Sequence, residues 1–448
     1  MSFKKSFGYR GAHPDDYKYI TNKNSISFTD VPDRVYIPVI QHIGAPAKIV
    51  VSVGQVVEEG QLIAEADGFV SANIHSSIPG TVAAIEERYI SVGKKSKTIV
   101  IELNGEFRKS GKNIHLTDWK SMTKDQLLKK IKDYGIVGMG GATFPTHVKL
   151  TIPNGKNVDT LIINGAECEP YITGDHRLMI DRSEDLLEGI NIINKILDVR
   201  NIYIGIESNK KDAIKRLKTL CLNRYNIKVV PLRVKYPQGD EKQIIKAITN
   251  RVVQVDQLPS DVGVIVQNVA TVIAIKEAIV NDKPLIDRIV TVSGSGVKEP
   301  KNLKVKIGTL LKEVIEECGG LKEDVKKVVI GGPMMGFAQY DLEVPVTKGC
   351  SAVVALSEDD YTDFIPNGIC LNCGKCINAC AFGLAPTVIN KYIKYNLFDK
   401  AAESGLMYCK ECGACAWSCP ARIPLVQNFR LGKDIYRKLT EKKKKNKG

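Results

Sequence analysis

The chain has 448 residues, of which 44% are hydrophobic and 25% charged, and a formal net charge of +14, a composition typical of a globular protein too long for one hydrophobic core. Its longest uncharged apolar stretch, Val262 to Ile275, is shorter than the ~18 residues of a membrane-spanning helix, and its basic N-terminus lacks the apolar run of a secretory signal, so we expect a cytosolic chain. The positive charge suits an acidic partner or an anionic membrane surface, whereas the aromatic residues, at 6%, are too sparse among the basic ones for a nucleic-acid stacking platform.

An N-terminal segment, 1–36, precedes a predicted β domain over 37–110. Turn signals such as Asp67-Gly68 and Pro79-Gly80 separate short predicted strands, at 47–53, 61–64, 68–72, 80–86 and 98–103. This stretch resembles the barrel-sandwich fold of lipoyl and biotinyl carriers, in which a lysine at a hairpin tip holds the prosthetic group. Gly68 stands at the position of that lysine, so we expect a docking or scaffolding role instead of a swinging arm.

Residues 120–288 are predicted to form an α/β domain. Apolar runs suited to a central parallel sheet alternate with segments of helical spacing. The expected strands are 158–163, 201–206, 228–230 and 262–266, and the expected helices are 123–134, 183–197 and 211–220.

A glycine-rich loop runs from Gly138 to Thr146 in this domain. Its glycines free the backbone to approach a phosphate or a flat ring, and the following Lys149 supplies positive charge. As a dinucleotide fingerprint the loop is weak, because Thr143 stands where a third glycine belongs and a helix precedes it. Taken alone, the loop is also compatible with a bare structural turn.

Three further polar segments follow predicted strands, at the positions where ligands bind in open α/β sheets. They are 164–170, 236–241 and 267–271. For the acidic pair Asp240 and Glu241 the alternative is a helix cap and a first-turn charge on a helix that runs through Ile248.

Two parts complete the predicted organisation. Residues 289–356 mix short strands with one helix, 309–317, and form a small α+β module. The segment 359–432 carries most of the cysteines, and a basic tail follows at 433–448. Its lysines at 442–445 and 447 predict a disordered, solubilising end, with lipid or partner contact as the alternative.

Eight of the twelve cysteines form two runs with the spacing C-x2-C-x2-C-x3-C, and each cysteine of the first run recurs 39 residues later, as 370 does at 409. Three closely spaced thiolates can coordinate three iron atoms of one iron–sulfur cubane. In two-cluster ferredoxins the fourth cysteine of each run coordinates the other cluster. Structural zinc fits poorly, because it usually takes two separate C-x2-C knuckles. We therefore assign one [4Fe–4S] cluster to Cys370, Cys373, Cys376 and Cys419, and the other to Cys409, Cys412, Cys415 and Cys380.

The other four cysteines are scattered. Cys221 and Cys318 lie in helical patterns and are expected to be small buried hydrophobic residues. We do not predict Cys168 or Cys350 to be a metal ligand.

The loops 138–146, 164–170, 236–241 and 267–271 together resemble the flavin and NADH site of the large nucleotide-binding subunit of respiratory complex I. With the Gly11-Ala12-His13-Pro14 opening, the barrel-sandwich segment and the twin cysteine runs, nearly the whole chain resembles the RnfC family, whose members belong to Rnf complexes, the ion-pumping ferredoxin:NAD oxidoreductases.

The resemblance implies a multidomain α/β and α+β fold. It comprises the barrel-sandwich domain, a Rossmann-like FMN/NAD domain with a parallel sheet, a β-grasp module over 289–356 and a C-terminal ferredoxin-like helical domain. The implied cofactors are two [4Fe–4S] clusters and non-covalent FMN, with NAD(H) as substrate.

The resemblance also implies site residues. FMN and the dinucleotide are cradled by Gly138, Gly140, Gly141 and Lys149, with Phe144 against the adenine. Glu169 is expected to meet the nicotinamide ribose. The residues that line the flavin are Asn164, Glu167, Tyr236, Gly239, Asp240, Glu241, Gln267, Asn268 and Thr271. Thr143, in place of glycine, and Asp240, in place of glutamate, depart from the pattern of the relatives.

The implied function is that of the NAD-facing subunit of a membrane-bound, ion-translocating ferredoxin:NAD oxidoreductase, attached peripherally on the cytoplasmic side. Its partners are the other subunits, among them a ferredoxin-like cluster subunit, and no nucleic acid. Flavin belongs between NAD(H), which exchanges a hydride, and the clusters, which carry single electrons, so no catalytic acid, base or nucleophile is expected. The alternatives are a flavin-free two-cluster carrier or scaffold, and an NADH-oxidising module of a cytosolic hydrogenase or dehydrogenase.

Overall fold

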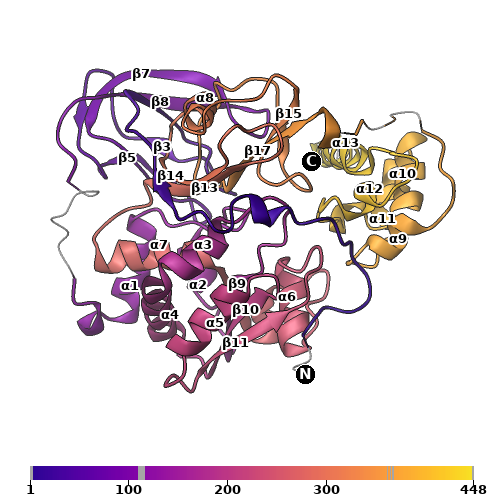
Figure 1. The fold of residues 1–448 in the computed structure, drawn as a ribbon, viewed down its shortest axis with the longest axis horizontal. Helices are drawn as coiled ribbons and strands as arrows, with labels where there is room; N and C mark the ends of the chain where they lie inside the picture. The colour runs from indigo at the N-terminus through magenta and orange to yellow at the C-terminus, as the bar shows by residue number, and fades with distance from the viewer. Residues whose placement is uncertain (1–3, 109–116, 361, 364, 366–367, 446–448) are drawn as a thin grey trace.

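The structure is a computed structural model that describes residues 4–108, 117–360, 362–363, 365 and 368–445. Lys447 of the predicted tail and the expected boundary residues 109–110 lie outside this part. Along the chain a β domain, an α/β domain, a mixed α+β module and a helical cluster domain follow one another, and the N-terminal segment runs between them (Figure 1). Short 3₁₀ helices lie at Lys18–Ile20, Trp119–Ser121, Pro259–Val262, Glu358–Asp360 and Leu406–Tyr408.

Two antiparallel sheets form the β domain, with strand orders β2-β8-β7-β4 and β3-β5-β6. The strands are β2 (Arg34–Pro38), β3 (Lys48–Ile49), β4 (Val56–Val57), β5 (Leu62–Glu65), β6 (Ile74–His75), β7 (Gly80–Tyr89) and β8 (Lys95–Leu103). Fully buried residues from both sheets, such as Ile37, Ile63 and Ile101, share one core. The strand expected at 68–72 is wrong: the amide of Asp67 donates to Ser71 Oγ at 3.0 Å and closes a turn there, and β6 begins only at Ile74.

The α/β domain confirms the predicted parallel sheet, with strand order β11-β10-β9-β12. Its strands are β9 (Thr160–Gly165), β10 (Asn201–Glu207), β11 (Ile227–Leu232) and β12 (Val264–Asn268). Its helices are α1 (Lys124–Asp133), α2 (Thr146–Leu150), α3 (Gly174–Asp181), α4 (Ser183–Leu197), α5 (Lys211–Leu220), α6 (Glu241–Thr249) and α7 (Val269–Val280). Leu161 and Ile163 pack in the core with α4 and α7, whereas Ile162 packs with α6, so β9 is apolar throughout because both faces of the sheet are covered.

The order of the strands creates a preferred ligand position. The chain builds β9, β10 and β11 in one direction and then returns to place β12 on the other side of β9. Ligands of open α/β sheets bind outside the carboxyl ends of the strands at such a switch point. The loops that follow β9 and β12 therefore border the expected site.

The α+β module contains a six-stranded mixed sheet of order β1-β14-β13-β17-β15-β16. Its strands are β1 (Ser27–Phe28), β13 (Asp287–Ser293), β14 (Lys301–Lys306), β15 (Val325–Ile330), β16 (Phe337–Gln339) and β17 (Ala352–Ser357). Helix α8 (Leu311–Glu316) packs on this sheet through buried residues such as Leu311 and Val353. Because β1 belongs to the N-terminal segment, that segment is part of the sheet.

The cluster domain is helical, with α9 (Lys375–Ala379), α10 (Pro386–Lys394), α11 (Phe398–Glu403), α12 (Ala414–Trp417) and α13 (Leu425–Lys445). The expectation of a disordered end is wrong up to Lys445, because α13 continues that far. Its first turns are fixed by the buried Val426 and Phe429. Lysine has good helix propensity and is favourable near the negative end of the helix dipole, so the basic run extends the helix.

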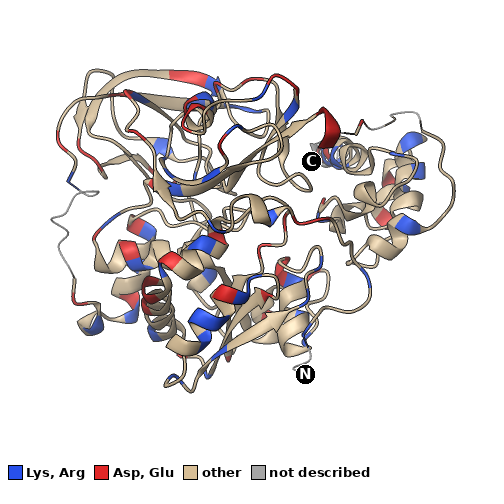
Figure 2. Cartoon of the chain, viewed as in Figure 1, with Lys and Arg blue, Asp and Glu red and all other residues tan. Residues whose placement is uncertain are grey.

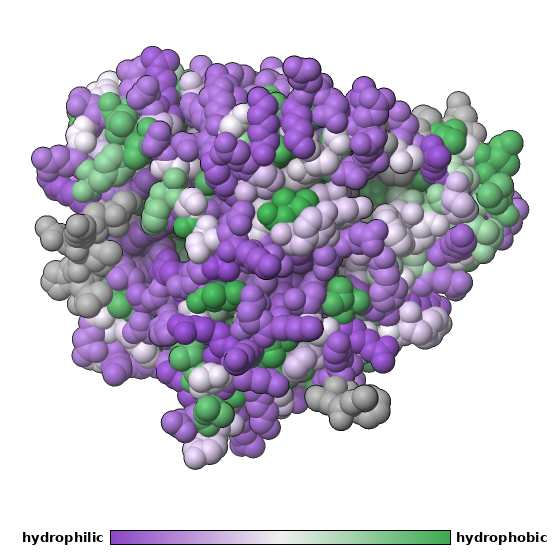
Figure 3. All heavy atoms as spheres, in the orientation of Figure 1, coloured by the Kyte–Doolittle hydropathy of each residue, from purple (hydrophilic) through white to green (hydrophobic). Residues whose placement is uncertain are grey.

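Charged residues are spread over the α/β and cluster domains in this view (Figure 2). Hydrophilic residues cover most of the visible face, and hydrophobic residues gather at its right edge, over the cluster domain (Figure 3). No helix in the described part of the chain combines the length and the apolar content needed to cross a membrane.

A buried lysine joins three of the four parts. Lys348, 1% exposed, donates from Nζ to the carbonyl of Asn73 at 2.6 Å and to that of Gly135 at 2.7 Å. Burial lowers the pKa of Lys348 to about 7, and it also lowers the pKa values of the neighbouring His42 and His75.

The lowered pKa of Lys348 predicts that the stability of the protein depends on pH. Its folded-state pKa, about 7, lies below the ordinary 10.5 of the unfolded chain, so between these values the unfolded state binds a proton that the folded state does not. The free energy of unfolding should therefore rise with pH, by up to about 1.4 kcal/mol per unit. We expect Lys348→Met to remove this rise, measured as thermal unfolding midpoints at pH 7 and 9. The exposed-site control Lys23→Met should retain it, and parallel curves for wild type and Lys348→Met would contradict the assignment.

Candidate redox site

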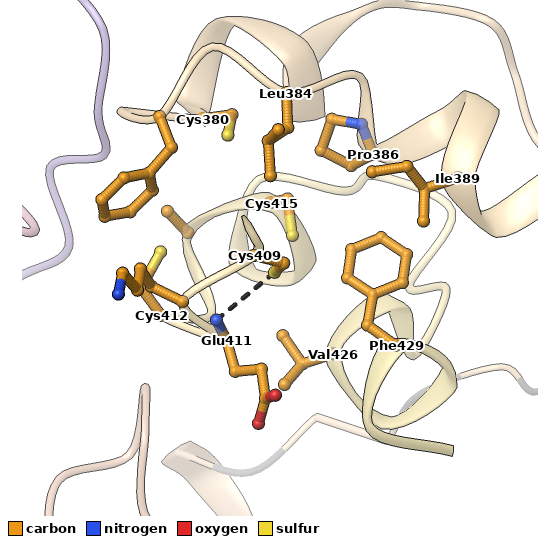
Figure 4. A pocket seen from close by; sticks show the side chains of 13 residues that line it. Cys380, Leu384, Pro386, Ile389, Cys409, Glu411, Cys412, Cys415, Val426 and Phe429 are labelled. Atoms are coloured by element: carbon orange, nitrogen blue, oxygen red, sulfur yellow. Dashed lines mark hydrogen bonds between the residues drawn. The ribbon is translucent and has the colours of Figure 1, made fainter. Parts of the chain in front are cut away.

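Four cysteines line one pocket of the cluster domain. Cys380 ends α9, Cys409 and Cys412 lie in the loop before α12, and Cys415 lies on α12. Figure 4 shows their side chains around the same space. Lys410 and Glu411 also line this pocket, and the rest of its wall is apolar, with Leu384, Pro386, Ile389, Val426 and Phe429 among the lining residues.

The remaining cysteines of the two runs line a second pocket. They are Cys370, Cys373, Cys376 and Cys419. Cys370 and Cys373 are exposed, whereas the first set is buried or half-buried. The structure thus brings together the two sets that the crossing of the fourth cysteine predicts, while their iron ligation itself stays a prediction.

The donor sets fit iron–sulfur clusters. No three described His, Cys, Asp or Glu side chains are placed to hold a single metal ion, and the thiols instead stand around each pocket. In a [4Fe–4S] cluster each thiolate binds a different iron atom, so four cysteines spread around the wall of one pocket fit such a cluster. Burial, together with the neighbouring Cys409 and Cys380, raises the pKa of the Cys412 thiol to about 12. Bound iron would reverse that shift, because a coordinated thiol loses its proton.

The glycine-rich loop is tied to the sheet and to the α+β module. The amide of Gly138 donates to the Phe144 carbonyl at 2.8 Å, and the amide of Met139 donates to Thr271 Oγ1 at 2.8 Å. The guanidinium of Arg288, on β13, donates to the Met139 carbonyl at 2.6 Å. Gly140 and Gly141 remain exposed at the turn of this loop, and Phe144 is half-buried.

Thr143 has a left-handed backbone, with φ of 50°. A β-branched residue rarely adopts that conformation, and glycine adopts it freely. The backbone at Thr143 is therefore strained.

Loops that follow β9, β11 and β12 meet at the carboxyl end of the sheet. Asn164 Nδ2 donates to the Gly239 carbonyl at 2.8 Å, which joins the first two loops. Asn268 caps α7 with its Oδ1 and donates from Nδ2 to Asp175 Oδ2 at 2.6 Å. Gln267 is 2% exposed, and its Nε2 has no hydrogen-bond partner among the described residues.

Glu167 belongs to the loop after β9, and its carboxylate lies against the first turn of α3. There it accepts hydrogen bonds from the amides of Asp175 at 2.6 Å and His176 at 3.3 Å. Burial raises its pKa to about 7, and the nearby ammonium groups of Lys18 and Lys210 oppose that rise. Lys210 Nζ donates to the Ala166 carbonyl at 2.6 Å.

Sequence reasoning missed three buried charges around these loops, Lys18, Lys210 and Arg288, and the half-buried Asp175. Lys210 follows strand β10 at the edge of the sheet that carries the other loops, so its position in the sequence could have identified it as a candidate site residue. Lys18 and Arg288 come from distant parts of the chain, and no local pattern identifies them.

The acidic pair after β11 divides between two roles. Asp240 Oδ1 accepts from the amides of Lys242 and Gln243 at 3.0 and 3.1 Å and caps α6, as the alternative interpretation anticipated. Glu241 forms an ion pair with Lys149 at 2.5 Å. Their contacts with flavin stay predictions.

Tyr236 and Glu169 lie where the α/β domain meets the cluster domain. The Tyr236 hydroxyl is 2.6 Å from the Cys412 carbonyl and 3.2 Å from Glu169 Oε1. Glu169 also accepts from the amides of Met334 at 3.2 Å and Met335 at 3.0 Å, and burial raises its pKa to about 7. Contact of Glu169 with a nicotinamide ribose stays a prediction.

The flavin-side residues fit a flat, polar ligand. The turn of the glycine-rich loop is exposed, an unpaired amide donor lies at Gln267, and polar side chains end two adjacent strands. Asn164 is hydrogen-bonded to Gly239 and is the register partner of Asn268 in the neighbouring strand. Asn268 in turn accepts a hydrogen bond from the amide of Thr271. Tyr236 is enclosed instead, at 1% exposure.

Cys221 and Cys318 are buried in the cores of the α/β domain and the α+β module, which confirms the prediction of small buried residues. Cys350 is also buried in the core of the module. The amide of Gly239 donates to Cys168 Sγ at 3.3 Å.

Comparison with protein families finds four matches along the chain. The RnfC barrel sandwich hybrid domain matches residues 6–106, and the Nuo51 FMN-binding domain matches residues 131–277. The SLBB domain matches residues 289–338, and the 4Fe-4S dicluster domain matches residues 363–442.

Whole proteins match as well. The chain is 45% identical to the C subunit of the proton-translocating ferredoxin:NAD(+) oxidoreductase complex of Clostridium ljungdahlii, over 88% of this chain and 86% of that protein. It is 40% identical to the C subunit of the Na(+)-translocating ferredoxin:NAD(+) oxidoreductase complex of Acetobacterium woodii, over 97% and 98% of the two chains. A solved NAD+-reducing [NiFe]-hydrogenase aligns with a TM-score of 0.49 and 17% identity, over 70% of this chain and 63% of that chain.

The crossing of the fourth cysteine predicts which substitutions act on the same cluster. We expect Cys380→Ser and Cys412→Ser to abolish most of one electron paramagnetic resonance signal of the reduced protein, and Cys419→Ser and Cys370→Ser most of the other. The buried control Cys221→Ala should leave both signals. If Cys380→Ser removes the same signal as Cys370→Ser, each run holds its own cluster and the crossed assignment is wrong.

Proposed function

This chain belongs to the RnfC family of ion-translocating ferredoxin:NAD(+) oxidoreductase complexes, and we propose that it is the NAD(H)-binding flavo-iron–sulfur subunit of such a complex. One observation carries the proposal: Cys412, one of four cysteines around a single pocket, accepts a hydrogen bond at its carbonyl from Tyr236, in the loop after β11 at the carboxyl end of the parallel sheet. A flavin held by the loops at that end would lie next to a one-electron acceptor.

The chain's own residues act here by binding and orienting. When bound, FMN supplies the exchange between a two-electron hydride and single electrons. Thr271 and Arg288 fix the glycine-rich loop so that Gly140 and Gly141 face outward. The Lys149–Glu241 ion pair supplies an ammonium donor, and Gln267 supplies an unpaired side-chain N–H donor, for a polar ligand. Orientation of the rings is the main requirement, because hydride exchange depends on close alignment.

An electron relay needs one cluster near the flavin and one near the protein surface, and the two cysteine sets differ in exposure accordingly. The set with Cys412 is enclosed beside the flavin loops, whereas Cys370 and Cys373 reach the surface. Exposed hydrophobic side chains flank the outer set, with Ile369 82% and Leu371 64% exposed. Exposed apolar groups beside a redox centre suit contact with another protein of the complex. We assign this surface to a partner that carries iron–sulfur clusters.

Placement at the cytoplasmic side of a membrane, as a peripheral subunit, is part of the proposal. The pumping of ions then takes place in other subunits of the complex. Specificity for ferredoxin and NAD is carried over from the names of the relatives.

Anaerobic purification tests the proposal. We expect FMN together with the iron and acid-labile sulfide that two [4Fe–4S] clusters require, and bleaching of the flavin absorbance by NADH. Protein with both clusters but no flavin would be a carrier or scaffold, and protein without acid-labile sulfide would overturn the whole assignment.

The ion pair of Lys149 and Glu241 predicts opposite shifts in flavin potential. Removing the carboxylate by Glu241→Gln leaves a net positive charge that favours the reduced, more negative flavin, so the potential should rise. Lys149→Gln should lower it, and the double variant should lie near wild type. We expect shifts on the order of 30 mV, a tenfold change in a two-electron equilibrium. Redox titration of the bound flavin measures them, and shifts of equal sign would contradict the placement of this pair beside the flavin.

A further inference from the structure

Tyr236 is a fully enclosed side chain that touches a cluster ligand. It belongs to the loop after β11, and its ring packs with Ala379 and Ala414 of the cluster domain. Ala379 directly precedes Cys380, and Ala414 lies between Cys412 and Cys415. Tyr236 is thus in contact with both segments that supply the inner cysteine set.

Two hydrogen-bond acceptors lie within reach of the Tyr236 hydroxyl, the Glu169 carboxylate and the Cys412 carbonyl. A buried tyrosine needs one hydrogen-bond partner, and Glu169, at 3.2 Å, would be sufficient. The Cys412 carbonyl is closer, at 2.6 Å. Because the hydroxyl carries a single proton, the shorter distance assigns it mainly to the carbonyl of the cysteine.

The backbone of Tyr236 is fixed from the opposite side by the N-terminal segment. Ala12 and Tyr236 exchange two backbone hydrogen bonds, of 2.8 and 2.9 Å. The neighbouring amide of Gly11 donates to the Asn378 carbonyl, on α9, at 3.4 Å. Gly11 has φ of 122°, and a Cβ there would lie 2.7 Å from the Tyr236 carbonyl, so only glycine fits.

The α+β module closes the same junction. Gly413 follows Cys412, and a Cβ at Gly413 would lie 2.4 Å from the Met334 carbonyl. Met334 in turn donates its amide to Glu169. The cysteine loop is therefore enclosed by three separate parts of the chain, with Tyr236 at their centre.

We propose that Tyr236 is the positioning residue of the inner iron–sulfur cluster, whose hydroxyl holds the Cys412 carbonyl and stabilises the reduced cluster. This inference rests on the proposed function. A reduced cluster carries one more negative charge, and a donor to the backbone of its ligand lowers the energy of that state, as hydrogen bonds around cluster sulfurs do. The same contact fixes the distance between the cluster and the flavin loops.

Tyr236→Phe tests the proposal because it keeps the buried ring and removes only the hydroxyl. The measurement is potentiometric titration of both clusters by electron paramagnetic resonance in the full-length, anaerobically purified protein. We expect the reduction equilibrium of the inner cluster to shift toward the oxidised form, with the outer cluster unchanged. The shift should not exceed about fivefold, the full worth of one hydrogen bond, because only the part of its energy gained on reduction counts. Substituting Cys412 and Cys370 separately identifies which signal belongs to which set.

Tyr171→Phe is the matched control. Tyr171 is also buried, at 3% exposure, and its hydroxyl donates to the carboxylate of Asp360 at 3.2 Å, so the variant loses a hydrogen bond whose acceptor is not a cysteine carbonyl. This control should leave both potentials unchanged.

Each possible result of these measurements either supports or contradicts the positioning role of Tyr236. Loss of the inner cluster alone from Tyr236→Phe, with the outer cluster and FMN retained, also supports the positioning role. Unchanged potentials, equal shifts of both clusters, or loss of both clusters together would overturn it. Wild-type protein with clusters but no flavin would contradict the proposed function and leave the role of Tyr236 at the inner cluster measurable.

Discussion

The contact between the loop that carries Cys412 and the carboxyl end of the parallel sheet is the constraint on which the rest of the structure depends. Electron transfer between a flavin and a cluster requires the two to be close, yet the residues predicted to hold them lie far apart in the sequence. The fold meets this requirement with the Tyr236 hydroxyl, the Glu169 carboxylate and two backbone hydrogen bonds from the N-terminal segment. A junction with fixed polar contacts holds its geometry more strictly than apolar packing alone, because each donor and acceptor specifies a direction.

Buried charges organise the flavin side of this junction. Lys18 and Lys210 are nearly inaccessible, and both donate to backbone carbonyls of the loop after β9. Burial of an ammonium group is costly unless it is paired, and here Glu167 and Glu207 lie close to both. The loop therefore has little freedom to move, which suits a site that must align rings.

Domains outside the flavin-binding unit contribute to the site directly. Arg288 of β13 holds the glycine-rich loop, and the amides of Met334 and Met335 bind Glu169. Lys348 joins the β domain, the α/β domain and the α+β module through two carbonyls. These parts form a frame around the predicted cofactor site.

The sequence by itself determined the chemistry of this protein. Cysteine spacing and strand-to-loop motifs are local patterns, so they predicted the parallel sheet, the glycine-rich loop and the two sets of cysteines that the structure gathers around separate pockets. Only the tertiary structure decided that Tyr236 touches Cys412, that Asp240 caps a helix and that Lys18 and Arg288 reach the site. The reason is physical: a local pattern reports the conformation and burial of its own segment, whereas a buried hydrogen bond between residues 236 and 412 depends on how whole domains pack. The course of α13 through the basic tail was decided in the same way, because its first turns are fixed by packing against the other helices of the cluster domain.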